Sequence, residues 1–152
     1  MHDSVYAWVK SIAPTLESPT LEVGSTNVNG TVRGLFAGDY VGIDIVAGPG
    51  VDRVYDGNRI PFDTATFATV LCLEVLEHAL RPWKVCAEIA RVLRPGGTAL
   101  VSARGNGFPL HHEPDRWRFM GGTIPGLFPG CETTEIADPQ PEHPGWLVTV
   151  RR

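Results

Sequence analysis

The sequence has few cysteines, and none of them forms a pair that would suit a metal site or a compact disulfide framework. The three cysteines, Cys72, Cys86 and Cys131, are widely spaced and include no Cys-x-x-Cys motif. Isolated cysteines of this kind are typical of free thiols in a reducing compartment. We therefore expect no structural disulfide, no zinc framework and no bound metal.

Long apolar runs and clusters of basic residues are also missing. No apolar stretch approaches the roughly 20 residues that cross a bilayer, and the first ten residues, MHDSVYAWVK, lack the charged and apolar regions of a secretory signal. The formal net charge is -4, without a lysine- and arginine-rich segment, so no nucleic-acid partner is expected. These absences predict a cytoplasmic protein that binds neither membrane nor nucleic acid.

The composition fits one compact domain that spans residues 1–152. Hydrophobic residues make up 43% and charged residues 20% of the chain, as in globular proteins with a packed core. Glycine and proline, at 17 and 13 residues, account for about a fifth of the chain. Such a content predicts short helices and many turns.

Short apolar segments alternate with segments of helical periodicity. Strands are predicted at residues 21–23, 40–45, 51–56, 67–74, 98–103, 131–137 and 146–152, and helices at 4–12, 30–36 and 82–93. This alternation predicts a parallel sheet with helices on its faces. The last two strands have no helix between them and should pair antiparallel. We expect a Rossmann-like, doubly wound α/β sheet of minimal length, mostly parallel with an antiparallel C-terminal strand.

Several polar residues fall where the predicted strands end, which is where doubly wound sheets bind ligands. The segment GSTNVNG after the first strand begins with Gly24, which allows close approach of the backbone to a ligand. Asp44 ends the second strand, 20 residues after Gly24, at the spacing expected of an acid that binds a ribose hydroxyl. This combination favours a nucleotide-like ligand.

Each of these residues also has a purely structural interpretation. Gly24 suits a tight turn, and Asp44 suits a solvated strand end. Asp56, after the third strand, is equally a turn former or an acceptor for an adenine amine. Glu77 and His78 fit the start of a helix, where acids are favoured. The residues are more informative together than singly.

The segment that carries these residues resembles a known family. LEVGSTNVNG, YVGIDI and the stretch from VYDGNRIPFD through LEVLEH to EIARVLRPGG resemble the class I S-adenosylmethionine-dependent methyltransferases, most closely the small-molecule type 11 group. The resemblance covers residues 20 to about 103. It implies S-adenosylmethionine as the cofactor and a seven-stranded sheet with an antiparallel final strand.

The resemblance also implies a set of cofactor-binding residues. They are Glu22, Gly24, Ser25, Asp44, Ile45, Asp56, Gly57, Leu73 and Glu74. The first three belong to the acidic strand end and glycine loop around the methionine part. Asp44 and Ile45 match the ribose-binding acid and the apolar neighbour of the adenine. The next two match the adenine-facing loop, and the last two match the segment beside the sulfonium.

The glycine loop departs from the pattern of the family. The common acid-x-Gly-x-Gly-x-Gly becomes Glu22, Gly24, Thr26 and Val28, with Asn29 and Gly30 before the next predicted helix. A dinucleotide site needs its glycines for close approach to a pyrophosphate, whereas S-adenosylmethionine has no pyrophosphate. We interpret the segment as a rebuilt loop, and a nicotinamide oxidoreductase is disfavoured.

Candidate catalytic residues follow the fifth predicted strand, in GNGFPLHHEPDRWRF. His111, His112 and Asp115 are side chains that could deprotonate a methyl acceptor. Alternatively, this segment is a structural loop in which Trp117 and Phe119 pack on the sheet. A metal site is not expected, because adjacent histidines rarely bind the same ion.

These features together predict methyl transfer to an oxygen or nitrogen atom of an acceptor. The predicted N-terminal cap is one short helix, which leaves the acceptor cleft open. An open cleft favours a large or carrier-bound acceptor, or a cleft closed by a second subunit in a homodimer. The alternative is a non-catalytic domain that binds S-adenosylmethionine or a partner, as the altered loop and small size would allow.

Overall fold

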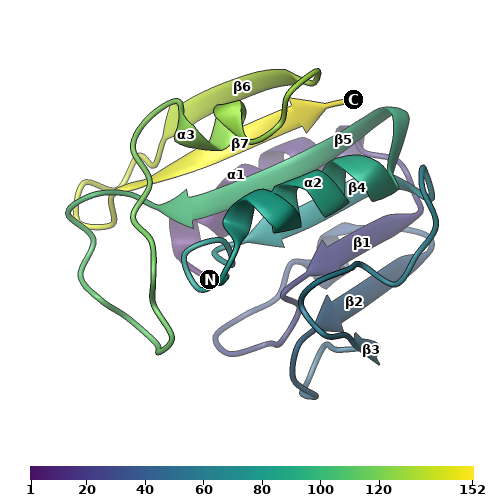
Figure 1. Ribbon diagram of the computed structural model, residues 1–152, viewed down its shortest axis with the longest axis horizontal. Coiled ribbons are helices and arrows are strands. Elements are labelled where there is room, and N and C mark those ends of the chain that lie inside the picture. Colours follow the sequence, from purple (N-terminus) through teal and green to yellow (C-terminus); the bar gives the residue numbers. More distant parts are fainter.

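The computed structural model describes residues 1–152 and contains one mixed sheet of seven strands in the order β3-β2-β1-β4-β5-β7-β6 (Figure 1). The strands are β1 (Thr20–Val23), β2 (Tyr40–Asp44), β3 (Arg53–Val54), β4 (Phe67–Leu73), β5 (Leu93–Arg104), β6 (Glu132–Ala137) and β7 (Gly145–Arg151). The first five strands pair in parallel, and β7 is antiparallel to both β5 and β6. The predicted Rossmann-like sheet with an antiparallel C-terminal strand is confirmed.

Two helices cover opposite faces of this sheet, α1 (Asp3–Ile12) and α2 (Pro82–Val92), as Figure 1 shows. In α1, Val5 and Val9 lie four residues apart and are fully buried. In α2, Pro82 occupies the first turn, where its missing N–H costs no hydrogen bond. A third helix, α3 (Thr123–Gly126), is a single turn that was not predicted.

The central strand β4 contributes side chains to the hydrophobic clusters on both faces of the sheet. All seven of its residues are buried. Because side chains alternate along a strand, Leu71 joins the cluster on the α1 side, whereas Val70 and Cys72 join the cluster on the α2 side. The near-continuous apolar run of β4 is thus explained by burial on both faces.

Three predicted elements have different bounds in the structure. The helix expected at 30–36 is only a 3₁₀ turn, Arg33–Leu35, because Gly30 (φ +121°) and Gly34 oppose helix formation. The third strand shrinks to two residues at the sheet edge, since Asp52 turns its carboxylate onto the Gly42 N–H at 2.7 Å. Strand β5 begins at Leu93 and continues through RPGG with a shift in register against β4.

The cysteines are unpaired. Burial raises the pKa of the Cys86 thiol to about 12 and raises that of Cys72 as well. Both groups are therefore protonated thiols packed in the core. None of the helices is both long enough and apolar enough to span a membrane.

Leu71→Ala is expected to destabilise the protein by about 2–5 kcal/mol, because it opens a cavity between β4 and α1. The measurement is denaturant unfolding followed by circular dichroism. Leu110→Ala serves as the control, since Leu110 is exposed. Equal unfolding midpoints for the two variants would contradict this account of the core.

Candidate functional site

A cleft of about 770 Å³ lies along the carboxyl ends of β1, β2, β4 and β5. All the cofactor-binding and catalytic residues predicted from the sequence line it. They are Glu22, Gly24, Ser25, Asp44, Ile45, Asp56, Gly57, Leu73, Glu74, His111, His112 and Asp115. The structure therefore brings the predicted residues together, while the role of each one stays a prediction.

The glycine loop is held tightly against the ends of β2 and β4. Gly24 has φ +78°, and a Cβ atom at this position would lie 2.3 Å from Val75 Cγ2. The N–H groups of Gly24 and Ser25 both donate to the carbonyl of Ile43, at 2.8 and 3.1 Å. Gly24 is thus required by the backbone turn and by packing, as well as lining the cleft.

Asp44 joins this loop to the end of β2. Its Oδ2 accepts a hydrogen bond from the Thr26 N–H at 2.9 Å, and its Oδ1 accepts one from the Ile45 N–H at 2.7 Å. Ile45 beside it is 60% exposed and Val28 across the loop is 71% exposed. An acid next to uncovered apolar side chains is the environment that a nucleoside requires, with polar groups for the ribose and apolar contact for the base.

Glu22 of β1 is held by a hydrogen bond from Tyr40 of the neighbouring strand β2. The Tyr40 hydroxyl donates to Glu22 Oε2 at 2.8 Å. Burial raises the pKa of Glu22, and this hydrogen bond only partly opposes the rise. The Arg33 guanidinium stacks on the Tyr40 ring at 5.0 Å, which fixes the ring in place.

Asp56 and Gly57 form a turn at the far end of the cleft. Asp56 Oδ1 accepts hydrogen bonds from the N–H groups of Asn58 at 2.9 Å and Arg59 at 3.3 Å, and Gly57 has φ +74°. Asp56 is therefore a turn former in the structure. Its exposed carboxylate keeps acceptor capacity on the other oxygen, which bonds only to the Asn58 amide, at 3.2 Å.

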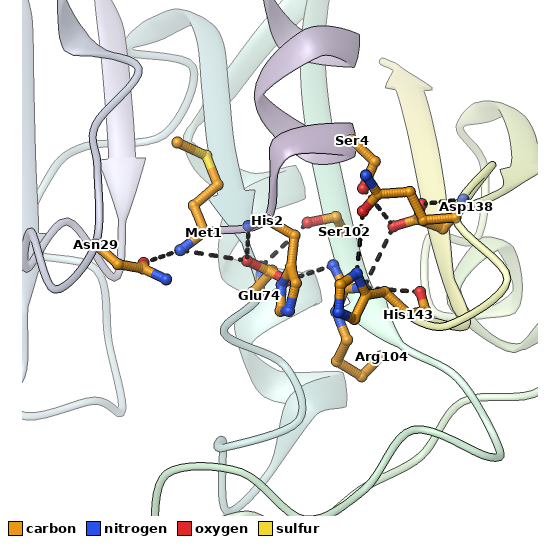
Figure 2. A network of polar contacts seen from close by, with 10 residues as sticks. Met1, His2, Ser4, Asn29, Glu74, Ser102, Arg104, Asp138 and His143 are labelled. Atoms are coloured by element: carbon orange, nitrogen blue, oxygen red, sulfur yellow. Dashed lines mark hydrogen bonds and ion pairs between the residues drawn. The ribbon is translucent and has the colours of Figure 1, made fainter.

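Glu74 lines the cleft and has a backbone conformation that is rare for a residue with a side chain. Its φ is +56°, and its N–H donates to the Ser102 carbonyl at 3.0 Å and to Ser102 Oγ at 3.1 Å. Such strain is often found at functional sites. It turns the carboxylate toward His2 and Arg104 (Figure 2).

A polar network extends from Glu74 to the connection between β6 and β7. Arg104, only 3% exposed, pairs with Glu74 and with Asp138, whose Oδ2 is 3.3 Å from Nη1. Ser4 Oγ donates to the same Asp138 oxygen at 2.9 Å. Burial alone would raise the pKa of Glu74, but Arg104 and His2 outweigh it and hold that pKa below its usual range. No sequence motif pointed to His2 or Asp138.

The β5–α3 loop, residues 105–122, closes one side of the cleft and is held by hydrogen bonds within the loop. Asp115 forms two hydrogen bonds to Arg118, at 2.5 and 2.6 Å, and accepts the His111 N–H at 2.7 Å. Arg118 holds the pKa of Asp115 down to about 2. This geometry favours a role for Asp115 in organising the loop over its predicted role as a base.

The two histidines of this loop lie at the rim of the cleft. The side chains of His111 and His112 are exposed, with ring centroids 3.9 Å apart and no side-chain hydrogen bond. The loop is fastened to the segment after β4, where the Glu77 carbonyl accepts the N–H groups of Arg116 and Trp117 at 2.8 and 3.1 Å. The histidines remain candidates for contact with an acceptor.

Glu77 is a buried acid that sequence reasoning assigned to the start of a helix. It is 2% exposed, lines the cleft, and its Oε2 has no hydrogen-bond partner. Burial raises its pKa to about 8, so the side chain is mostly neutral at pH 7.

No group of three or more histidine, cysteine, aspartate or glutamate side chains is placed to hold a metal ion.

The strand order and the cleft at the carboxyl ends of the strands define a Rossmann-like cofactor-binding domain. Residues 21–101 match the family model described as a methyltransferase domain. This match covers more than half of the 152 residues, and the chain belongs to the methyltransferase domain family.

The curated relatives match over short segments. An uncharacterized methyltransferase of Mycobacterium marinum (strain ATCC BAA-535 / M) is 42% identical over 55 residues, which cover 36% of this chain and 22% of the relative. One of Mycobacterium avium (strain 104) is 37% identical over 68 residues, or 44% of this chain and 27% of the relative. The matches thus span about a quarter of the length of these relatives.

Solved structures share the fold at low sequence identity. The 1,6-didemethyltoxoflavin-N1-methyltransferase of Burkholderia thailandensis, with bound 1,6-didemethyltoxoflavin and S-adenosylhomocysteine, gives a TM-score of 0.78 at 16% identity, covering 97% of this chain and 78% of its own. The [4+2]-cyclase SpnF gives 0.74 at 15% identity, covering 99% and 81%. At these identities the similarity establishes the fold alone.

Glu77→Gln is expected to change how stability depends on pH. The folded protein keeps the Glu77 proton up to about pH 8, whereas a carboxyl in the unfolded chain loses it near pH 4.5. The unfolding free energy should therefore fall as pH rises between these values, by at most about 1.4 kcal/mol per pH unit. Glutamine cannot ionise, so this contribution should vanish.

Denaturant unfolding at a series of pH values measures the effect. Glu132→Gln is the matched control, because Glu132 is exposed on β6. A wild type and a Glu77→Gln variant with the same pH slope would show that Glu77 ionises normally in the folded protein.

Proposed function

We propose that the protein is an S-adenosylmethionine-dependent methyltransferase that acts on an oxygen or nitrogen atom of a small-molecule or carrier-bound acceptor. The observation that carries this proposal is the joint placement of Asp44, Ile45 and the Gly24 loop along one side of the cleft. Membership in the methyltransferase domain family supports it. The S-adenosylhomocysteine bound to the Burkholderia thailandensis methyltransferase is consistent with the same cofactor here.

The residues present fit this cofactor. The cleft volume of about 770 Å³ lies within the range of roughly 300–1,000 Å³ found for small-molecule sites. Asp44 would accept hydrogen bonds from the ribose hydroxyls, and the uncovered side chains of Ile45 and Val28 would contact the base. Gly24 and Glu22 would lie near the methionine part, where no pyrophosphate has to be accommodated.

The bound cofactor supplies a methyl group on a positively charged sulfur, which is already a good leaving group. The protein then has to align the acceptor with the methyl carbon and keep water away. In this proposal the β5–α3 loop, with His111 and His112 at the rim of the cleft, contacts the acceptor. We also propose that the acceptor is large or carrier-bound, or that a second copy of the chain covers the cleft.

We further propose that the protein is located in the cytoplasm.

One observation favours a second function, a non-catalytic domain that binds the cofactor or a partner. The segment after the glycine loop is a 3₁₀ turn of three residues instead of a helix, and the fold also occurs in the [4+2]-cyclase SpnF. Cofactor binding without methyl transfer to any acceptor would support this alternative. A nicotinamide enzyme is not favoured, because the loop lacks the glycine spacing that a dinucleotide needs.

Asp44→Ala should weaken binding of S-adenosylmethionine and S-adenosylhomocysteine by about 1.5–3 kcal/mol, or roughly 10- to 150-fold in Kd, because it removes a charged acceptor for the ribose hydroxyls. Isothermal titration calorimetry measures this loss. Asp44→Asn distinguishes loss of the negative charge from loss of the loop contact, because it removes the charge while its amide oxygen still accepts a hydrogen bond from the Thr26 N–H.

Asp63→Ala provides the control, because Asp63 is an exposed acid outside the cleft. Its affinity should equal that of the wild type. If Asp44→Ala also binds as well as the wild type, the assignment of this acid to the ribose is wrong.

A further inference from the structure

We propose that His2 is the general base of the methyl transfer, held in position by Glu74, and that the acceptor atom therefore carries a proton that it must lose. This inference rests on the proposed function. It assigns a catalytic residue outside the segment that matches the family model, which covers residues 21–101. It also narrows the acceptor to a hydroxyl or an N–H group.

The His2 imidazole is fixed by two contacts to one carboxylate. Its Nδ1 lies 2.5 Å from Glu74 Oε1, and its backbone N–H donates to Glu74 Oε2 at 3.0 Å. Two contacts of this kind fix both the backbone and the ring. A carboxylate acceptor at Nδ1 selects the tautomer with the proton on Nδ1, which leaves a lone pair on Nε2.

That lone pair is available to a ligand. Nε2 forms no hydrogen bond within the protein and is accessible to solvent. The imidazole is 21% exposed and lines the cleft. In Figure 2, His2 lies between Asn29 of the glycine loop on one side and Arg104 and His143 on the other. The His2 ring also contacts Phe108 of the β5–α3 loop, so it stands between the proposed cofactor side and that loop.

Glu74 is itself held rigidly, as a positioning residue requires. Arg104 pairs with the same oxygen that faces His2 Nδ1, and Ser102 holds the strained backbone of Glu74 at two points. The Phe108 ring meets the imidazole edge-on at a centroid distance of 5.4 Å. The base thus has few alternative orientations.

Burial favours the neutral, basic form of His2 over the charged form, although several charged groups surround the ring. Glu74 faces it from β4, Arg104 from β5, His143 from the β6–β7 connection, and the Met1 amino group lies 3.6 Å from Glu74. Burial lowers the pKa of His2, and Glu74 only partly offsets this, with Arg104 and His143 adding to the decrease. A neutral imidazole can accept a proton, whereas an imidazolium cannot.

The acceptor oxygen or nitrogen forms a bond to the methyl carbon, while the methyl–sulfur bond breaks and its electron pair stays on sulfur. His2 Nε2 takes the proton of the acceptor and becomes an imidazolium, which the Glu74 carboxylate stabilises. The proton then passes to water. Tertiary amines, pyridine-type nitrogens and carboxylates carry no such proton and need no base.

His111 and His112 lack this arrangement. Their imidazoles are exposed, and no carboxylate contacts either ring, because Asp115 is engaged by Arg118 and by the His111 backbone. An unoriented surface imidazole is a weaker base catalyst than one fixed by a carboxylate. Between the three histidines, the geometry points to His2.

The first experiment needs neither cofactor nor acceptor. Protein labelled with nitrogen-15 histidine and tagged only at the C-terminus is titrated with pH, and the ring nitrogens of His2 are followed by NMR. The wild type should show the Nδ1–H tautomer at neutral pH. In Glu74→Gln, the fixed tautomer should be lost and the pKa of His2 should fall, because the stabilising negative charge is gone.

Glu142→Gln is the matched control, since Glu142 is exposed next to His143 and outside the network; it should leave His2 unchanged. An Nε2–H tautomer in the wild type would overturn the proposal. A His2 signal that does not respond to Glu74→Gln would also overturn it.

The second experiment measures transfer with radiolabelled methyl donor and a panel of probe acceptors: phenols, alcohols, secondary amides, pyridines and tertiary amines. We expect label in hydroxyl or N–H probes only. His2→Asn keeps a donor toward Glu74 but has no Nε2, and it should lower kcat by roughly 10²–10⁴-fold with little change in the KM for the donor.

In the wild type, kcat should rise with pH through the pKa of His2. This pH dependence should be absent in His2→Asn and present in His111→Ala and His112→Ala. Full turnover in His2→Asn would overturn the proposal, as would label that enters only pyridines and tertiary amines, or none of the hydroxyl and N–H probes. A wild type that binds no S-adenosylhomocysteine in calorimetry would instead overturn the proposed function, while the NMR result would still report on the His2–Glu74 pair.

Discussion

The buried guanidinium of Arg104 is the constraint on which the site depends. A charge with 3% exposure is tolerated only if it is paired, because desolvation of an unpaired ion costs several kcal/mol. Two carboxylates from distant parts of the chain, Glu74 and Asp138, supply the pairing. These ion pairs connect the end of β4, the end of β5 and the β6–β7 connection. Ser4, which bonds to Asp138, and His2, which bonds to Glu74, attach the start of α1 to the same network.

Around this ion-pair network, the cleft divides into two sides of different character. On one side, β1 and β2 end in backbone turns, with Gly24 packed on Val75 and Asp44 bonded to the Thr26 amide of the glycine loop. On the other side, the β5–α3 loop is held by its own Asp115–Arg118 pair and by the carbonyl of Glu77. Glu74 stands between the two, and its strained backbone is the point where a cofactor side and an acceptor side would meet.

The elements that the sequence predicted well are those governed by local rules. The near-continuous apolar run of β4 can be buried on both faces only as a central strand, and the spacing of Val85, Cys86 and Ile89 in α2 places them on one face only in a helix. The predictions that were wrong involved competing tendencies. Gly30 and Gly34 interrupt a segment that was expected to be helical, and Gly96 (φ +79°) and Gly97 lie within a strand that was expected to begin after them.

The sequence by itself determined the α/β class, the antiparallel end of the sheet, the family and the side of the cleft that follows β1 and β2, because those residues lie within contiguous motifs whose spacing carries the information. Only the tertiary structure decided the partners of Glu74 and Arg104. His2 lies 72 residues from Glu74 along the chain, Asp138 lies 34 residues from Arg104, and neither belongs to a motif. These contacts depend on how α1 packs on the sheet and on how β6 and β7 pair within it, and contacts between distant segments leave no periodic trace in a single sequence.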